Sequence, residues 1–323
     1  MSTALSPNFN NLFLKSFAKS LEINLPINEQ FGKLSKNQIE TNIRTGDEID
    51  FLMPPEGTLN AHSVANITYQ KVKTNTIKIV CDQAFDYGFS FEDSEIAHIN
   101  ALPEEKAVPF ITDLTKNVTE KFITKRELTM ANLSSFAGFK LNESPIYNPS
   151  SDGNYGASAS YVAPLNPLAL TQSNIKIYFQ NMASLLQDGQ IIDGVPRSSW
   201  KEGKMLMFVP PSLKGLLVGT GDFKYTAIGV ENAIKGEIGE YAGFRIIQTN
   251  MIQPTTTGGN IFNILAGIEG EVFGTIMTKN LTSETLRDVN TIATLYRGLG
   301  IFGVKYVRRD KAATSLVSVS YKS

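Results

Sequence analysis

Apolar and polar residues alternate most regularly over residues 85–92, which read FDYGFSFE. Every second position is aromatic, and the positions between are acidic, glycine or serine. A period of two is typical of a β-strand with one buried face, because successive side chains of a strand point to opposite sides of its sheet. The pattern predicts a strand whose buried face carries Phe85, Tyr87, Phe89 and Phe91.

A helical period runs through residues 103–138. Pro103 and the two glutamates after it suit a first helical turn, where proline needs no hydrogen-bond donor and acidic side chains interact well with the helix dipole. Pro109 is expected to kink or delimit that turn, and Gly138 is predicted as the C-cap. At about 1.5 Å per residue the helix spans on the order of 50 Å. Its apolar residues recur at Val108, Ile111, Leu114, Val118 and Phe122.

The amino-terminal part combines short predicted elements with polar sequence. Residues 10–22 predict a short amphipathic helix, and the polar sequence that follows, to about residue 45, predicts an extended arm. Strands are predicted at 46–53 and 67–80, joined by a turn-rich loop at 54–62. A two-stranded hairpin of this kind buries little apolar surface, so its strands need another surface to lie on.

The second half predicts an α/β unit followed by a strand-rich end. Residues 144–167 are rich in Ser, Gly, Asn and Pro and predict a surface loop. A helix at 171–188, with Thr171 or Ser173 as its N-cap, is expected to bury Ile177, Met182, Leu185 and Leu186. A short helix is predicted at 212–219. Strands are predicted at 204–210, 243–250, 261–267, 273–282, 284–292, 299–307 and 315–321. The fold class is therefore α+β.

The composition is that of an ordinary globular protein, with 323 residues, 42% hydrophobic, and a formal net charge of −1. A nucleic-acid reader of this size carries a basic excess, which this sequence lacks. The first twenty residues lack the basic start and apolar core of a secretory signal, and no window reaches the roughly 18 apolar residues of a membrane span. The one cysteine, Cys81, lies in an apolar run and is expected to be a buried, unreactive thiol.

Residues that could carry catalysis are few. The two histidines, His62 and His98, have no second nitrogen ligand near them in the sequence, which gives a histidine metal site little support. Acidic residues within 82–95 could bind a divalent cation, but a polar strand face and a helix N-cap explain them better. The sequence therefore predicts no catalytic, cofactor-binding or metal-binding residue, and no enzyme.

Two other features could be functional or structural. Trp200 could anchor an interface, but packing within a loop is at least as good an interpretation. The pair Arg308 and Arg309 could contact phosphate, although such a pair more often closes a strand end or meets a partner's carboxylate.

Five segments, in this order, resemble the major capsid proteins of tailed double-stranded DNA phages, the Hong Kong ninety-seven type. GDEIDFLMPPEG at 46–57 resembles the strand that leads into the extended loop of that family, and residues 82–97 resemble the strand that leaves the loop. GKMLMFVPPSLKGLLVGTGDF at 203–223 and GEIGEYAGFRIIQTNMI at 236–252 resemble passages of its axial domain. RGLGIFGVKYVRR at 297–309 resembles a late strand of its peripheral domain. Their order and spacing make the resemblance specific.

The resemblance implies a capsid fold with five parts. These are an amino-terminal arm (1–45), an extended hairpin loop (46–80), a peripheral domain with a long spine helix (81–165), an axial domain (166–260), and return strands that belong mostly to the peripheral domain (261–323). The family assembles as pentamers and hexamers that close into an icosahedral shell around packaged double-stranded DNA. Subunit contacts are then expected at Met53, Pro54, Pro55, Glu56, Thr256, Thr257 and Gly258.

The resemblance also implies partners. The chain reaches its loop by residue 46, too early for the long amino-terminal scaffolding segment of some relatives, so a separate scaffolding protein, or none, is expected. A portal and decoration or minor capsid proteins are further partners, DNA needs only non-specific contacts, and no membrane is involved. The location is the virion, after assembly in the host cytoplasm. No lysine is assigned to the isopeptide crosslink of some relatives.

Two alternatives stand beside this interpretation. An encapsulin-type nanocompartment shell of the same fold would enclose a cargo enzyme rather than DNA, and neighbouring genes would distinguish the two. A hydrolase or binding enzyme would use the acidic residues of 82–95, and it would need a metal-dependent activity that is lost in Asp82→Asn and Asp86→Asn.

Overall fold

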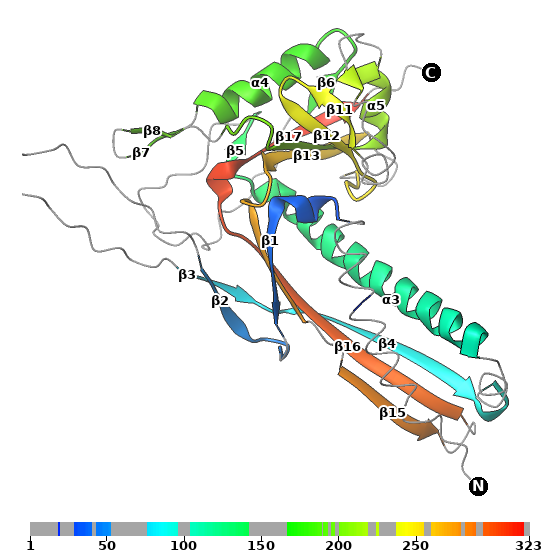
Figure 1. The fold of residues 1–323 in the computed structure, drawn as a ribbon. Coiled ribbons are helices and arrows are strands. Elements are labelled where there is room, and N and C mark those ends of the chain that lie inside the picture. Colours follow the sequence, from blue (N-terminus) through cyan, green and yellow to red (C-terminus); the bar gives the residue numbers. More distant parts are fainter. Residues whose placement is uncertain are drawn as a thin grey trace, which may run out of the picture.

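The computed structural model describes most of the chain between residues 29 and 319. The described residues are 19, 29–40, 43–52, 76–95, 104–141, 167–188, 190–192, 195–197, 200–218, 224–225, 237–254, 260–278, 282–288 and 293–319. The predicted helix at 10–22, apart from residue 19, and the predicted loops at 54–62 and 144–167, apart from residue 167, lie outside them. The molecule is elongated, with an eight-stranded sheet at one end, a five-stranded sheet extending away from it, and a long helix alongside (Figure 1).

The eight-stranded sheet is built around a central strand, β9 (Met205–Val209), whose five side chains are all fully buried. It pairs in parallel with β12 (Phe244–Gln248) and antiparallel with β13 (Ile261–Ile268), and β13 pairs with β17 (Ala312–Val319). Short strands complete the sheet: β10 (Lys224–Tyr225) and β11 (Glu237–Tyr241) at one edge, and β5 (Phe139–Lys140) and β6 (Leu168–Leu170) at the other. Helices α4 (Ile175–Asp188) and α5 (Pro211–Val218) lie on one side of this sheet (Figure 1). Because β9 is covered on both faces, it reads as a continuous apolar run.

The five-stranded sheet is organised by β16 (Ala293–Tyr306), which pairs antiparallel with β4 (Gln83–Glu92), β14 (Phe273–Thr278) and β15 (Thr282–Asp288). Strand β1 (Ser35–Glu40) adds in parallel to β14. The predicted alternation of β4 is confirmed, since its aromatic side chains are buried or half-buried and the residues between them are exposed.

The long helix α3 (Glu104–Asn132) packs against the five-stranded sheet and continues into a 3₁₀ turn, η2 (Leu133–Phe136). Its 29 residues give a length of roughly 44 Å at the usual rise per residue. Phe122 and Ile123 cluster with Met277 and Phe302 of the sheet. None of the described helices is long and apolar enough to cross a membrane.

Smaller elements complete the described chain. A two-stranded hairpin is formed by β2 (Glu48–Leu52) and β3 (Thr76–Val80), and a second one by β7 (Gln190–Ile192) and β8 (Val195–Arg197). Two further 3₁₀ turns are η1 (Phe31–Leu34), just before β1, and η3 (Arg309–Lys311), between β16 and β17. Strand β4 follows β3 after only two residues, so the β2–β3 hairpin leads directly into the five-stranded sheet.

Two local expectations, for Ile177 and Gly138, are wrong. Ile177 is 58% exposed, because the buried face of α4 is set by Ile175, Tyr178 and the residues one and two turns later, and a residue two positions after Ile175 points away from that face. The regular helix begins at Ile175, and Thr171 caps the turn before it: its carbonyl oxygen accepts from Ile175 N at 3.1 Å and its N–H donates to Asn174 Oδ1 at 2.8 Å. Gly138 is not the C-cap, which for the terminal 3₁₀ turn is Ala137.

Gly138 instead meets a packing requirement. Its backbone N–H donates to the carbonyl oxygen of Arg309 at 2.9 Å, and a Cβ on residue 138 would overlap that carbonyl group. A glycine is therefore needed for close approach of two backbones, not for a left-handed helix end. The strands of 261–323 also divide between the two sheets: β14, β15 and β16 lie in the five-stranded sheet, and β13 and β17 in the eight-stranded one.

The stretch EIGEYAGFRII forms a tight hairpin between β11 and β12, in which Tyr241 pairs with Phe244. Both residues of its two-residue loop have positive φ, 50° at Ala242 and 82° at Gly243. Positive φ at both positions is the type I′ pattern, which matches the twist of the flanking strands and favours Asn-Gly. A Cβ on Gly243 would also lie 2.6 Å from the ring of Trp200, whose ring centroid is 5.2 Å from that of Phe244. Trp200 therefore packs on the hairpin within its own subunit.

We predict that Ala242→Asn raises the free energy of unfolding by about 0.5–1 kcal/mol, because asparagine tolerates the left-handed conformation better than alanine. Gly243→Ala should lower it by about 2 kcal/mol or more, since it adds both backbone strain and a clash with Trp200. Urea unfolding of the unassembled subunit measures both changes. Equal stability of Ala242→Asn and the unmodified chain would contradict the strain at residue 242.

Candidate functional site

The base of the β2–β3 hairpin is anchored on the five-stranded sheet by one apolar face. Phe51, Ile77 and Ile79 are buried in a cluster to which the sheet contributes Ile276 and Ile301. The opposite face is polar: Lys78 Nζ lies 3.1 Å from Glu48 Oε2, and this hydrogen bond raises the pKa of Lys78. The expectation that the hairpin needs a surface is met at its base by the sheet of its own subunit.

The seven residues predicted to make subunit contacts lie outside the described residues. Met53, Pro54, Pro55 and Glu56 directly follow β2, and Thr256, Thr257 and Gly258 fall between Pro254 and Asn260. The residues on either side of 256–258 are fixed by backbone pairing. Pro254 forms an isolated antiparallel β-bridge with Phe262, and the carbonyl oxygen of Asn260 accepts from Val319 N at 2.9 Å. The described residues that flank the two groups belong to different sheets: β2 to the two-stranded β2–β3 hairpin, and Asn260 to the edge of the eight-stranded sheet.

Both outer strands next to β16 have open edges in the described chain. Strand β4 pairs along its whole length with β16 only, and so does β15. An open edge carries a row of backbone N–H and C=O groups that another strand can use. The large exposed apolar residues are spread over five elements rather than gathered on one face: Ile39, Val80, Leu168, Ile177 and Leu286. Strand edges and loops, rather than one apolar patch, are the candidate contact features of this part of the chain.

Residues 29–40, which we call the strap, lie where the two sheets meet (Figure 1). The side chains of Phe31 and Leu34 are fully buried in the core of the eight-stranded sheet, and Phe31 stacks on Phe208 with ring centroids 4.4 Å apart. The following residues, β1, extend the five-stranded sheet. Beside β1, the hydroxyl groups of Ser35 and Thr275 form a buried hydrogen bond of 2.6 Å. The strap thus belongs to both sheets.

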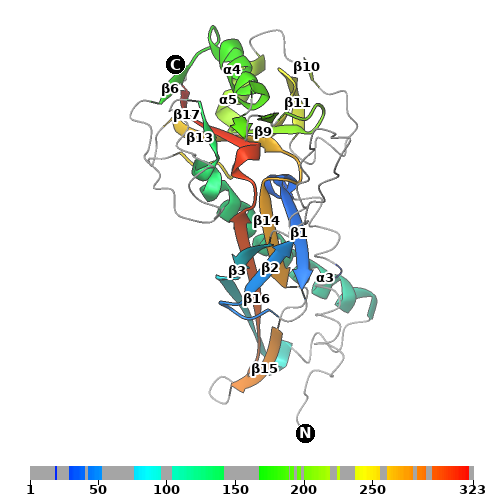
Figure 2. The same ribbon diagram turned by 90° about the vertical axis from the view of Figure 1, so that its left-hand side faces the viewer.

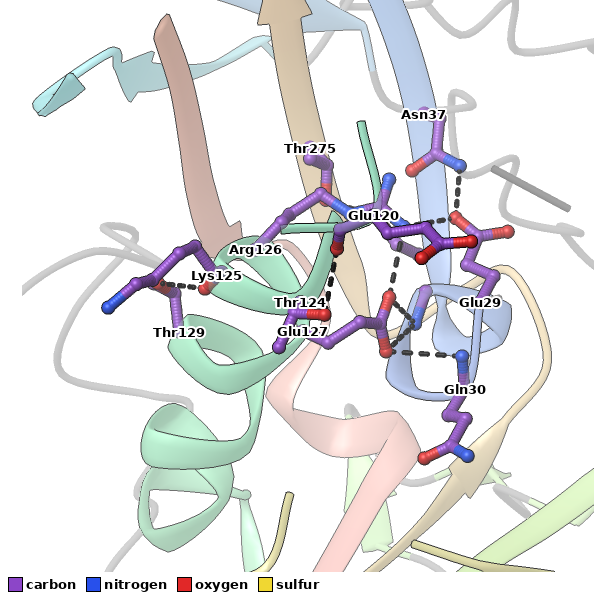
Figure 3. Close-up of polar contacts among 12 residues, drawn as sticks. Glu29, Gln30, Asn37, Glu120, Thr124, Lys125, Arg126, Glu127, Thr129 and Thr275 are labelled. Atoms are coloured by element: carbon purple, nitrogen blue, oxygen red, sulfur yellow. Dashed lines mark hydrogen bonds and ion pairs between the residues drawn. The ribbon is translucent and has the colours of Figure 1, made fainter. Parts of the chain in front are cut away.

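Two charged side chains of α3 hold the start of the strap (Figure 3). Glu127, 1% exposed, accepts hydrogen bonds from the backbone N–H of Gln30 at 3.1 Å and of Gly32 at 3.2 Å. Arg126, fully buried, donates from Nη2 to Glu29 Oε1 at 2.6 Å and to Glu127 Oε1 at 3.0 Å. Burial raises the pKa of Glu127, and the charge of Arg126 opposes that shift. We call Glu29, Arg126 and Glu127 the clamp.

None of the three clamp residues was predicted as a functional residue from the sequence. A signal was present, because Arg126 stands four residues after Phe122 and four before Met130, within the apolar stripe of α3. A charged residue in such a stripe is buried, and a buried charge requires partners. Nothing in the sequence identified Glu29 as the partner, since it is nearly a hundred residues away.

The other candidate residues have structural surroundings. Asp82 and Asp86 are exposed, and the backbone N–H of Glu92 donates to Glu95 Oε2 at 3.1 Å, the reciprocal bond of a helix N-cap. Among the described residues no three His, Cys, Asp or Glu side chains lie close enough to hold a metal ion. Cys81 is buried, and burial raises the pKa of its thiol to about 11. His62 and His98 lie outside the described residues.

Arg308 follows the end of β16, and its Nη2 lies 3.2 Å from Asp310 Oδ2. Arg309 begins the 3₁₀ turn η3, and its carbonyl oxygen receives the N–H of Gly138. This pair therefore closes a strand end, which is the structural interpretation of the two considered from the sequence.

Comparison with known proteins finds similar structures but no similar sequences. No family model and no curated protein matches the sequence. The capsid structure of the cyanophage P-SCSP1u superimposes with a TM-score of 0.53 at 14% identity, covering 90% of this chain and 88% of that one. The mature capsid of bacteriophage PhiM1 gives 0.49 at 12% identity, covering 92% and 88%, and a virus-like particle from Pyrococcus furiosus gives 0.43 at 11%, covering 94% and 99%.

The likeness to the cyanophage capsid extends over nearly the whole of both chains, so it concerns the complete arrangement of sheets, hairpin and long helix rather than one shared motif. The mixed architecture predicted from the sequence is confirmed at this level. The chain has the fold of the major capsid proteins of tailed phages.

Proposed function

We propose that this protein is a major capsid protein, whose copies assemble as pentamers and hexamers into an icosahedral shell that encloses packaged double-stranded DNA. The observation that carries the proposal is the superposition on a cyanophage capsid protein over 90% of this chain and 88% of the other. A fold alone does not specify a function. Here it is joined by the ordered sequence resemblance to the same family and by a hairpin whose base is anchored on the five-stranded sheet.

The charge of the chain suits this role. Thirty basic and 31 acidic residues give a net charge of −1, so many copies can pack side by side without strong mutual repulsion. The inner surface of such a shell holds DNA without reading its sequence, for which non-specific backbone contacts are enough. A structural rather than catalytic role follows from the proposal.

The parts of the chain take the following proposed roles. The eight-stranded sheet with α4 and α5 is the axial domain at the centre of a capsomer, and the five-stranded sheet with α3 is the peripheral domain. The proposed boundary at residue 260 then needs adjustment, because 261–268 and 312–319 pair within the eight-stranded sheet. Residues 1–45 remain the proposed arm and 46–80 the proposed extended loop.

The proposal includes partners beyond the subunit itself. These are a separate scaffolding protein, a portal, and decoration or minor capsid proteins, with assembly in the host cytoplasm and a final location in the virion. The decisive experiment is expression of the chain with its neighbouring genes, followed by electron microscopy and nuclease treatment of the purified particles. Closed shells containing nuclease-protected DNA support the proposal. Shells that carry a protein cargo and no DNA would identify a nanocompartment, and a permanent monomer would refute a shell role.

We predict that deletion of residues 54–60 leaves a folded subunit that no longer assembles. The buried hairpin base at Phe51, Ile77 and Ile79 stays intact, so the melting temperature of the unassembled subunit should change little. Replacing 54–60 by a Gly-Ser segment of equal length is the control that separates loop length from loop contacts. Size-exclusion chromatography and electron microscopy measure assembly, and loss of the subunit fold would show that the loop is placed wrongly.

We predict that a short Gly-Ser insertion between Thr256 and Thr257 disturbs closure of pentamers and hexamers before it affects subunit stability. The flanks at Pro254 and Asn260 are fixed by strand pairing, so an insertion between them should be tolerated by the fold. The same insertion between Gly153 and Asn154 serves as the matched control. Normal shells from the Thr256 insertion would contradict a position near the capsomer axis.

A further inference from the structure

The strap lies directly on the junction between the two sheets. Helix α3 joins the two sheets, since it packs on the five-stranded sheet and leads through η2 into β5 of the eight-stranded sheet. Besides it, two short segments connect the sheets in the described chain: 269–272, between β13 and β14, and 307–311, between β16 and β17. The two segments are bonded to each other, since Val307 N and Arg308 N donate to the carbonyl oxygen of Val272 at 2.9 and 3.2 Å. The first segment also donates to the strap, from Gly270 N to Lys33 O at 2.8 Å and from Val272 N to Leu34 O at 2.9 Å.

Val272 is therefore shared by all three segments at the junction. Its N–H is bonded to the strap and its carbonyl oxygen to the other connection. A change in the angle between the sheets has to be absorbed by such short connecting segments, because the packed sheets themselves resist deformation. The strap is bonded to Gly270 and Val272 and inserted into both sheets, so it is positioned to resist that change.

The clamp determines whether the strap stays in place. Glu127 holds the backbone of Gln30 and Gly32, and Arg126 holds the side chain of Glu29, which also accepts from Asn37 Nδ2 at 2.8 Å. Within the described chain Arg126 Nε and Nη1 are buried with no acceptor. Leaving buried donors of a charged group unsatisfied lowers the stability of the arrangement that contains them. The docked strap is therefore held by hydrogen bonds to two charged side chains, but two donors of one of them, Arg126, have no acceptor within the described chain.

We propose that residues 29–40 form a detachable strap that locks the angle between the two sheets, and that Arg126 and Glu127 are the positioning residues that keep it docked. Undocking frees the edge of β14 and the junction at 269–272 while both sheets remain folded. This inference goes beyond the proposed function and is tested on the unassembled subunit, so it stands or falls independently of whether shells form.

The first test is hydrogen exchange of individual amides in Glu127→Gln. The variant keeps the shape of the side chain but replaces one acceptor oxygen by an NH₂ group that faces Arg126. Exchange at Gly32, Gly270, Val272 and along β1 should accelerate about 30-fold, the factor expected for loss of a hydrogen bond to a charged group. Exchange in β12 should not change, because the eight-stranded sheet stays folded.

The matched control is Glu48→Gln, the same chemical change in an exposed ion pair with Lys78. It should leave exchange unchanged at all of these amides, since exposed pairs contribute little. Equal acceleration in the strap and in β12 would mean that Glu127 contributes only to global stability, and no acceleration would mean that the clamp does not hold the strap. Either result overturns the proposal.

The second test measures the angle itself. Spin labels at Ser90→Cys on β4 and Ser184→Cys on α4 report the distance between the two sheets, and both positions are exposed. Cys81 is fully buried and stays unlabelled. The distance distribution should be narrow in the labelled parent chain and in Glu48→Gln, and broad in Glu127→Gln. A distribution that remains narrow after the strap has opened would refute the role of the strap in fixing the angle.

A milder variant keeps the proposal testable where Glu127→Gln yields no folded protein. Glu29→Gln weakens the 2.6 Å bond to Arg126 but leaves the two backbone bonds of Glu127 in place. Its effect on strap exchange and on the distance distribution should have the same direction and be smaller. No effect of Glu29→Gln on either measurement would overturn the clamp.

Discussion

The burial of Arg126 and Glu127 is the constraint on which the junction of the two sheets depends. Neither charge can stay inside the protein without partners, because an unpaired buried charge is strongly destabilising. Neighbouring residues of α3 form the first pair, but a helix offers few other partners at that depth. The remaining bonds come from the strap: the carboxylate of Glu29 and the backbone amides of Gln30 and Gly32. The requirement to satisfy two charges therefore draws a segment from the start of the chain onto a helix nearly a hundred residues later.

Once the strap is docked, other features of the junction follow. Phe31 and Leu34 enter the core of the eight-stranded sheet, and the next residues leave in the direction of β14, to which they add as a parallel edge strand. Figure 2 shows β1 and β14 side by side, running from the eight-stranded sheet toward the other end of the molecule. The docked strap also leaves little room for a side chain at position 267. A Cβ on Gly267 would lie 3.4 Å from Leu34 and 2.8 Å from Val272. Apolar packing, strand pairing and the clamp thus all stabilise the same docked position of the strap.

Local sequence patterns predicted the elements whose burial repeats regularly. The alternation in 85–92 and the continuous apolar run of β9 each identify a strand. A strand with one buried face alternates between apolar and polar residues, and a strand with two buried faces is apolar throughout. The apolar stripe of α3 identified the helix but not the function of Arg126 within it. Ile177 was misplaced because a helix with apolar residues on several sides does not reveal which face is buried until its neighbours are known. The same limit applies to Gly138, whose requirement for a small residue comes from Arg309, far away in the chain.

The predicted contact residues had a different basis. Met53 to Glu56 and Thr256 to Gly258 carry no periodic pattern and were assigned by the order of motifs around them, so they stay a prediction and their partners have no signal in the sequence. Those partners are other copies of the chain in the proposed shell, and no pattern within one subunit encodes their geometry. A shell of pentamers and hexamers also requires one chain to fit two kinds of neighbourhood. In the proposed shell, adjustment at the junction around Val272 would let one chain fit both neighbourhoods while the packing within each sheet is kept. Phe273 and Tyr306 of the five-stranded sheet enter the core of the eight-stranded sheet at this junction.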